Sequence, residues 1–75
     1  MKAQPIETNA QLRLEILLKY RFVKRAANDM DFTSNRDYQR FRNTLLGSSR
    51  DLQVIKKLTE TYSNINTYKI WGVRL

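Results

Sequence analysis

The sequence contains no cysteine and no histidine, and it has only two glycines and one proline among 75 residues. Without cysteine the chain cannot form a disulfide, and without both residue types it lacks the ligands of a structural zinc site. A chain of this length forms a single domain and buries a smaller fraction of its surface than a larger protein does. Its fold therefore depends on side-chain packing or on a partner.

Side chains that could carry catalysis are also scarce. The serines at positions 34, 48, 49 and 63 stand where helix caps and turns are expected. Asp37 and Asp51 fall in predicted first turns, where a carboxylate complements the helix dipole, and Asp29 with Asp31 supplies too few ligands for a metal. Two glycines cannot build a glycine-rich phosphate loop. We therefore predict no catalytic residue, no metal site and no cofactor, and hence a protein that is not an enzyme.

Long apolar runs are missing as well. Residues 1–9 contain Lys2 but no apolar segment of the length that a signal peptide needs, and no stretch approaches the length of a membrane span. The absence of cysteine is compatible with a reducing compartment. We expect a soluble, cytoplasmic protein without a membrane partner.

Positive charge is what the sequence has in excess. Fourteen Lys and Arg residues stand against seven Asp and Glu residues, which gives a formal net charge of +7 at neutral pH. Clustered cations gain free energy when they release counterions from phosphates. The composition thus favours a polyanionic partner, with a basic surface that only keeps the protein soluble as the alternative.

Three segments combine helical periodicity with a capping box, in which an N-cap hydroxyl and the side chain three residues later satisfy free amide groups. The three pairs are Thr8 with Gln11, Ser34 with Asp37, and Ser48 with Asp51. These starts predict helices over residues 9–28, 35–46 and 49–63.

Gly47 follows the second predicted helix, at the place where a left-handed residue commonly ends a helix, and this favours a tight turn before the third. The second and third helices then resemble a helix-turn-helix in their geometry. The predicted fold class is all-α: a small three-helix bundle over residues 9–63, preceded by an N-terminal arm over residues 1–8.

The last twelve residues, 64–75, leave the helical pattern. Asn64-Ile65-Asn66 favours a turn, and the strand-prone residues that follow include Ile70, Trp71 and Val73. We predict an extended C-terminal tail. A lone strand cannot satisfy its own hydrogen bonds, so the tail either lies across the helices, anchored by Trp71, or pairs with another chain. Packing within the chain is the favoured alternative.

Apolar residues at helical spacing define the predicted core. They are Leu12, Ile16, Tyr20, Val23 and Ala27 in the first helix, Tyr38, Phe41 and Leu45 in the second, and Leu52, Ile55, Leu58 and Tyr62 in the third. The aromatic residues among them are interpreted as packing residues and not as platforms for base stacking.

The first predicted helix carries three further leucines, Leu14, Leu17 and Leu18, on the side opposite its core face. This is too much leucine for a surface that meets only water. The simplest cover is the rest of the chain, with the first helix central. A homodimer or a partner protein is the alternative.

The outer faces of the second and third helices combine cations with amides. Arginine, asparagine and glutamine make bidentate contacts with base edges, whereas lysine more often contacts the phosphate backbone. The candidate nucleic-acid-binding residues are Arg36, Gln39, Arg40, Asn43, Arg50, Gln53, Lys56 and Lys57. A solvated helix surface is the alternative interpretation.

Together these features predict a non-catalytic module that binds nucleic acid, duplex DNA in the first place, in a role such as transcription regulation. The alternative is a small adaptor or inhibitor that docks on a protein through Leu14, Leu17, Leu18 and Trp71. Neither function involves a small-molecule substrate.

Overall fold

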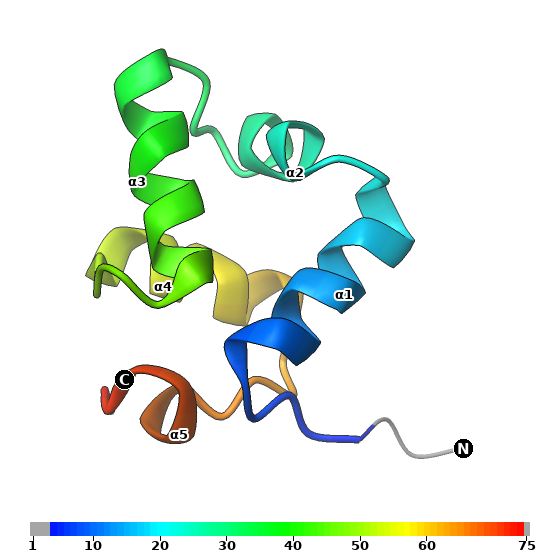
Figure 1. Cartoon of the computed structure of the whole chain (residues 1–75), viewed down its shortest axis with the longest axis vertical. Coiled ribbons are helices and arrows are strands. Elements are labelled where there is room, and N and C mark those ends of the chain that lie inside the picture. Colours follow the sequence, from blue (N-terminus) through cyan, green and yellow to red (C-terminus); the bar gives the residue numbers. More distant parts are fainter. Residues whose placement is uncertain (1–3, 75) are drawn as a thin grey trace.

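The computed structural model describes residues 4–74, and over this range the chain is mostly helical, as Figure 1 shows. Its helices are α1 (Asn9–Tyr20), α2 (Val23–Asp29), α3 (Asn35–Leu46), α4 (Leu52–Thr61) and α5 (Thr67–Trp71). The described range contains no β-strand, only an isolated bridge between Ile6 and Ile65. The prediction of an all-α fold is confirmed. Five helices are present, however, where three were predicted.

The first predicted helix, over residues 9–28, is wrong in one respect: the chain breaks after Tyr20. Arg21 has a φ of 69°, and its N–H donates to the carbonyl of Leu17, which closes α1. Phe22 is extended and precedes α2. The change of direction, visible in Figure 1, lets α2 pack against both α1 and α3 and buries Ala26 and Ala27.

The second predicted helix, over residues 35–46, is confirmed at both ends as α3. The Ser34 hydroxyl accepts a hydrogen bond from the N–H of Asp37, as the capping pattern predicts. Gly47 has a φ of 84°, and the N–H of Ser48 donates to the carbonyl of Asn43. A Cβ at position 47 would also lie 3.0 Å from the Asn9 side chain, so both backbone and space favour glycine.

The third predicted helix, over residues 49–63, corresponds to α4, which begins later and ends earlier than expected. Asp51 is the N-cap, because its carboxylate accepts hydrogen bonds from the N–H groups of Gln53 and Val54. Ser48 is therefore not the cap, and residues 47–51 form a longer link than the tight turn that was predicted. A single carboxylate oxygen of Asp51, Oδ1, accepts from both of these amide groups of the first turn.

The predicted extended tail is wrong in its secondary structure, because residues 67–71 form α5, capped by the Asn66 side chain. Its predicted packing within the chain is confirmed. Trp71 is 4% exposed, and its indole N–H donates to the carbonyl of Thr44 at 2.9 Å. Trp71 consequently belongs to the core and not to a protein interface. Leu75, the end of the predicted tail, lies outside the described residues.

The N-terminal arm is part of the fold from residue 4 onward, while residues 1–3 of the predicted arm lie outside the described range. Ile6 is 3% exposed. Its N–H donates to the carbonyl of Asn64, and its carbonyl accepts from the N–H of Asn66. The arm thus lies beside the segment that leads into α5, below α1 in Figure 1.

The core gathers around α3, which contacts α1, α2 and α4. Phe41 and Leu45 are fully or almost fully buried, and the Phe41 ring lies 5.6 Å from that of Phe32. One predicted core residue is misplaced: Leu52 is 58% exposed, and Val54 is buried instead. Since α4 starts at residue 52 and not 49, Leu52 lies at its free N-terminal end.

The leucines on the far side of α1 are not covered by the rest of the chain. Leu14, Leu17 and Leu18 are 57%, 45% and 72% exposed, and the expectation that the chain itself would bury them is wrong. The bend after Tyr20 explains this, because it lets α2 pack back on α1, and α2 and α3 share the core that buries Leu12 and Ile16. None of the helices within residues 4–74 is both long and apolar enough to cross a membrane.

The burial of Trp71 yields a test of the tail's contribution to stability. Replacing Trp71 with alanine should lower the free energy of unfolding by about 3–5 kcal/mol, because a large cavity opens next to Thr44. Trp71→Phe retains most of the apolar contact and loses the hydrogen bond, so its loss should be smaller, about 1–2 kcal/mol. Urea unfolding measures both values. Equal stability of the parent and the alanine variant would contradict this packing.

Candidate nucleic-acid interface

One side of α3 faces solvent along its whole length and carries two arginines and two amides. Arg36, Gln39, Arg42 and Asn43 are all exposed. At 100° per residue Arg36, Gln39 and Asn43 lie on the side opposite the buried Phe41, and Arg42 lies at the edge of that side. We call these four residues the outer face of α3. Within the described chain no hydrogen bond or ion pair involves the side chain of Arg36 or Arg42. Both guanidinium groups are therefore available to a ligand.

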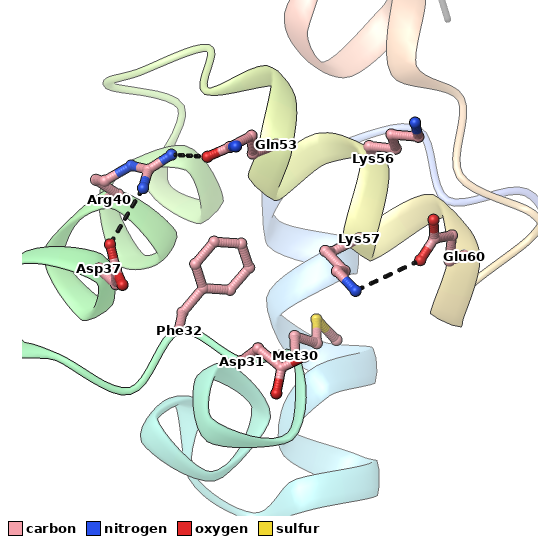
Figure 2. A pocket seen from close by; sticks show the side chains of 9 residues that line it. All are labelled: Met30, Asp31, Phe32, Asp37, Arg40, Gln53, Lys56, Lys57 and Glu60. Atoms are coloured by element: carbon pink, nitrogen blue, oxygen red, sulfur yellow. Dashed lines mark hydrogen bonds and ion pairs between the residues drawn. The ribbon is translucent and has the colours of Figure 1, made fainter.

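Arg40, which was predicted to belong to this face, turns away from it. Its Nε donates to Asp51 at 2.6 Å, and its two terminal nitrogens donate to Asp37 at 3.1 Å, to Asp51 at 3.1 Å and to Gln53 at 2.6 Å. Figure 2 shows Arg40 between Asp37 and Gln53. The hydrogen bonding that Arg40 donates to the Asp51 carboxylate is the main reason why the pKa of Arg40 is raised. Arg40 and Gln53 thus make contacts within the chain, and their predicted role in nucleic-acid binding stays a prediction.

Asp51 has two structural roles at once. It caps α4, and it accepts two hydrogen bonds from Arg40, which lies on α3. The Arg40 guanidinium, aided by the N–H groups of Val54 and Gln53, holds the pKa of the Asp51 carboxyl below its usual value. This ion pair holds the start of α4 against the middle of α3. The same guanidinium also offsets the negative charge of Asp37.

The predicted residues on α4 line a different surface, a groove of about 430 Å³ between α3, α4 and the link from α2 (Figure 2). We call it the α3–α4 groove. Lys56 and Lys57 lie in it together with three acids, Asp31, Asp37 and Glu60, and the Lys57 ammonium is 3.9 Å from Glu60. Its charges are mixed, whereas the outer face of α3 has no acid.

The eight predicted residues therefore divide into three groups. Arg36, Gln39 and Asn43 share the outer face of α3, and the structure does bring them together. Arg40, Gln53, Lys56 and Lys57 line the α3–α4 groove, and Arg50 is exposed in the link between the helices. Arg42 was missed, because on a helical wheel it lies close to the buried stripe formed by Tyr38 and Leu45.

The aromatic residues of the predicted core make contacts within the chain. The Tyr20 hydroxyl donates to Asp29 at 2.8 Å, and burial, followed by this hydrogen bond, raises the pKa of Tyr20 to about 12. The Lys24 ammonium lies 5.7 Å from the centre of the Tyr38 ring. These contacts leave no aromatic side chain on the outer face of α3, so any recognition there relies on charge and hydrogen bonds.

Comparisons of the chain with models of protein families, with curated proteins and with solved structures gave no match. Within residues 4–74, no three acidic side chains form a group that could hold a metal ion. The site must consequently be judged on its own chemistry.

The Arg40–Asp51 pair predicts a dependence of stability on acidity. A carboxyl with a lowered pKa in the folded state stabilises the protein above the ordinary aspartate pKa of about 4, and this contribution is lost as the pH falls through the folded-state value. Asp51→Asn keeps a good N-cap and removes the charge. Chemical unfolding across the acidic range should therefore show a shallower loss of stability in Asp51→Asn than in the parent.

The matched control is Glu60→Gln, which also converts an acid to its amide but changes only an exposed pair. Its acid profile should follow that of the parent. Parallel profiles for the parent and Asp51→Asn would show that the pair contributes nothing to stability.

Proposed function

We propose that the protein is a non-catalytic DNA-binding module that contacts duplex DNA through the outer face of α3. The observation that carries this proposal is the segregation of charge on α3: Arg36 and Arg42 face solvent, while its one acid, Asp37, faces the α3–α4 groove and pairs with Arg40. A face that offers only cations and amides attracts phosphates and repels none of them.

The dimensions of α3 suit a major groove. At 1.5 Å per residue, Arg36 and Asn43 lie about 10 Å apart along the helix axis, which corresponds to roughly three base pairs. The major groove is about 12 Å wide and admits an α-helix. In Figure 1, α3 stands at the edge of the molecule with its length exposed, so a duplex could approach it without displacing another helix.

The helix-turn-helix-like pair that supports this proposal is α2 with α3, and not the pair α3 with α4 that the sequence suggested. In a helix-turn-helix the second helix enters the major groove and the first helix packs behind it. Here α2 packs on α3 and presents Lys24 and Arg25 to solvent. The exposed side of α4, in contrast, borders a groove in which three acids offset the charge of its cations, so it attracts phosphates less than the outer face of α3 does.

The four side chains of the outer face have distinct proposed roles. Arg36 and Arg42 are long enough to contact phosphates on either side of a groove or to read guanine. Gln39 and Asn43 are the types that form bidentate contacts with adenine, and they lie one turn apart between the arginines.

The alternative function, a small adaptor or inhibitor, rests on fewer residues than the sequence suggested. Trp71 is buried and cannot dock on a partner. The leucines of α1 remain as its only support.

Salt-dependent binding tests the proposal. The affinity of the parent and of Arg36→Ala, Arg42→Ala and the double variant is measured on a duplex at several salt concentrations. Each lost phosphate contact should weaken binding and reduce the slope of log affinity against log salt by roughly one unit. The control is Arg74→Ala, which removes one arginine far along the chain from α3 and should leave the slope unchanged. A double variant that binds like the parent at every salt concentration would remove the outer face of α3 as the site.

In the same assay, Asn43→Ala separates base recognition from charge. As a reader of bases, Asn43 should contribute about 1–3 kcal/mol to the discrimination between the preferred and other duplexes. Its loss should leave the salt slope nearly unchanged, because no charge is removed. Unaltered discrimination in Asn43→Ala would limit the face to contacts with the DNA backbone.

A further inference from the structure

Lys24 joins α2 to the proposed DNA-binding helix through an aromatic ring. Its ammonium lies 5.7 Å from the centre of the ring of Tyr38, a residue of α3, on which α2 packs (Figure 1). A cation at this distance from a ring is attracted to it. Lys24 is exposed, and within residues 4–74 it belongs to no ion pair. Its charge is therefore held against α3 without being neutralised.

The place of Tyr38 on α3 puts this charge beside the outer face. Tyr38 and Arg42 are four residues apart on the helix, so their side chains are neighbours, separated by about 40° on the helical wheel. Arg36 lies at the other edge of the outer face, about 120° from Arg42. Lys24 consequently borders the outer face of α3 on its Arg42 side.

The acids of α2 and α3 are engaged elsewhere. Asp29 is the one acid of α2, and its carboxylate accepts a hydrogen bond from the Tyr20 hydroxyl at 2.8 Å. Asp37 is the one acid of α3, and it pairs with Arg40 beside the α3–α4 groove. A phosphate that approaches Lys24 from the outer face of α3 thus meets cations and no carboxylate of these two helices.

We infer that Lys24 contacts a phosphate of the DNA backbone on the Arg42 side of α3, and that the Tyr38 ring positions it for this contact. The inference rests on the proposed function, in which the outer face of α3 meets a duplex. A helix in a major groove has a phosphate backbone on either side, and contacts to these phosphates set the orientation of the protein. Lys24 brings α2 into the binding surface, and Tyr38 gains a role besides packing.

The chemistry of lysine suits such a contact. The ammonium has three N–H donors, and attraction to the face of a ring leaves donors free for a phosphate. A long side chain loses conformational freedom when a ligand immobilises it, and this loss opposes binding. Because the Tyr38 ring already restricts Lys24 in the free protein, less freedom is lost when DNA binds.

The affinity for a duplex of mixed sequence, measured at several salt concentrations, tests the contact. Lys24→Gln should reduce the slope of log affinity against log salt by roughly one unit, whereas Lys24→Arg keeps the charge and should keep the parental slope. The matched control is Lys19→Gln. Lys19 is also an exposed lysine over tyrosine rings, those of Tyr20 and Tyr62, but neither ring belongs to α3, so its loss should leave the slope unchanged.

A double-mutant cycle tests the positioning role of Tyr38. Tyr38→Leu should weaken binding roughly two- to tenfold with an unchanged salt slope, because it frees Lys24 but removes no charge. Tyr38→Phe keeps the ring and should bind like the parent. When Lys24→Gln is already present, Tyr38→Leu should cause no further loss, which a general disturbance of α3 would still cause. Circular dichroism checks that each variant is folded.

The possible failures can be told apart. A parental salt slope in Lys24→Gln, while the loss of Arg36 and Arg42 still weakens binding, overturns the inference and leaves the proposed function standing. An equal loss from Tyr38→Leu with and without Lys24 overturns the positioning role. A parent that binds no duplex at low salt overturns both the inference and the proposed function.

Discussion

The burial of the inner side of α3 is the constraint on which the rest of the structure depends. Phe41 and Leu45 contact the surrounding helices, and Thr44 between them is fully buried yet satisfied, because its hydroxyl donates to the carbonyl of Arg40 and its own carbonyl accepts from Trp71. A buried polar group without such partners would cost stability. With its inner side buried in this way, α3 presents its outer face to solvent.

The division of charge follows from that placement. Arg40 lies at the border between the two sides of α3 and turns toward Asp37 and Asp51. The Arg40–Asp51 pair is partly buried and joins α3 to the start of α4. Arg40 and Asp37 both line the α3–α4 groove, and in the described chain Arg36 and Arg42, which lie outside it, pair with no acid.

Local signals in the sequence predicted local structure well, and α3 shows why: Ser34 and Gly47 determine its ends through their own backbone and side-chain chemistry. The break at Arg21 had no such signal, since a non-glycine residue at positive φ is uncommon. The candidate site was predicted only in part, because it also depends on contacts between residues that are distant in the sequence. A helical wheel placed Arg36 correctly, but the partner of Arg40 is eleven residues away on another helix, and only the tertiary structure reveals it.

The central claim is that the outer face of α3, and not the α3–α4 groove, contacts DNA. Titration of the isotope-labelled protein with a short duplex, followed by amide resonances, tests it most directly. The account predicts that the signals of Arg36, Gln39, Arg42 and Asn43 shift first and furthest, while those of Lys57 and Glu60 in the groove change little. Shifts confined to the groove or to α1, with α3 unaffected, would contradict it.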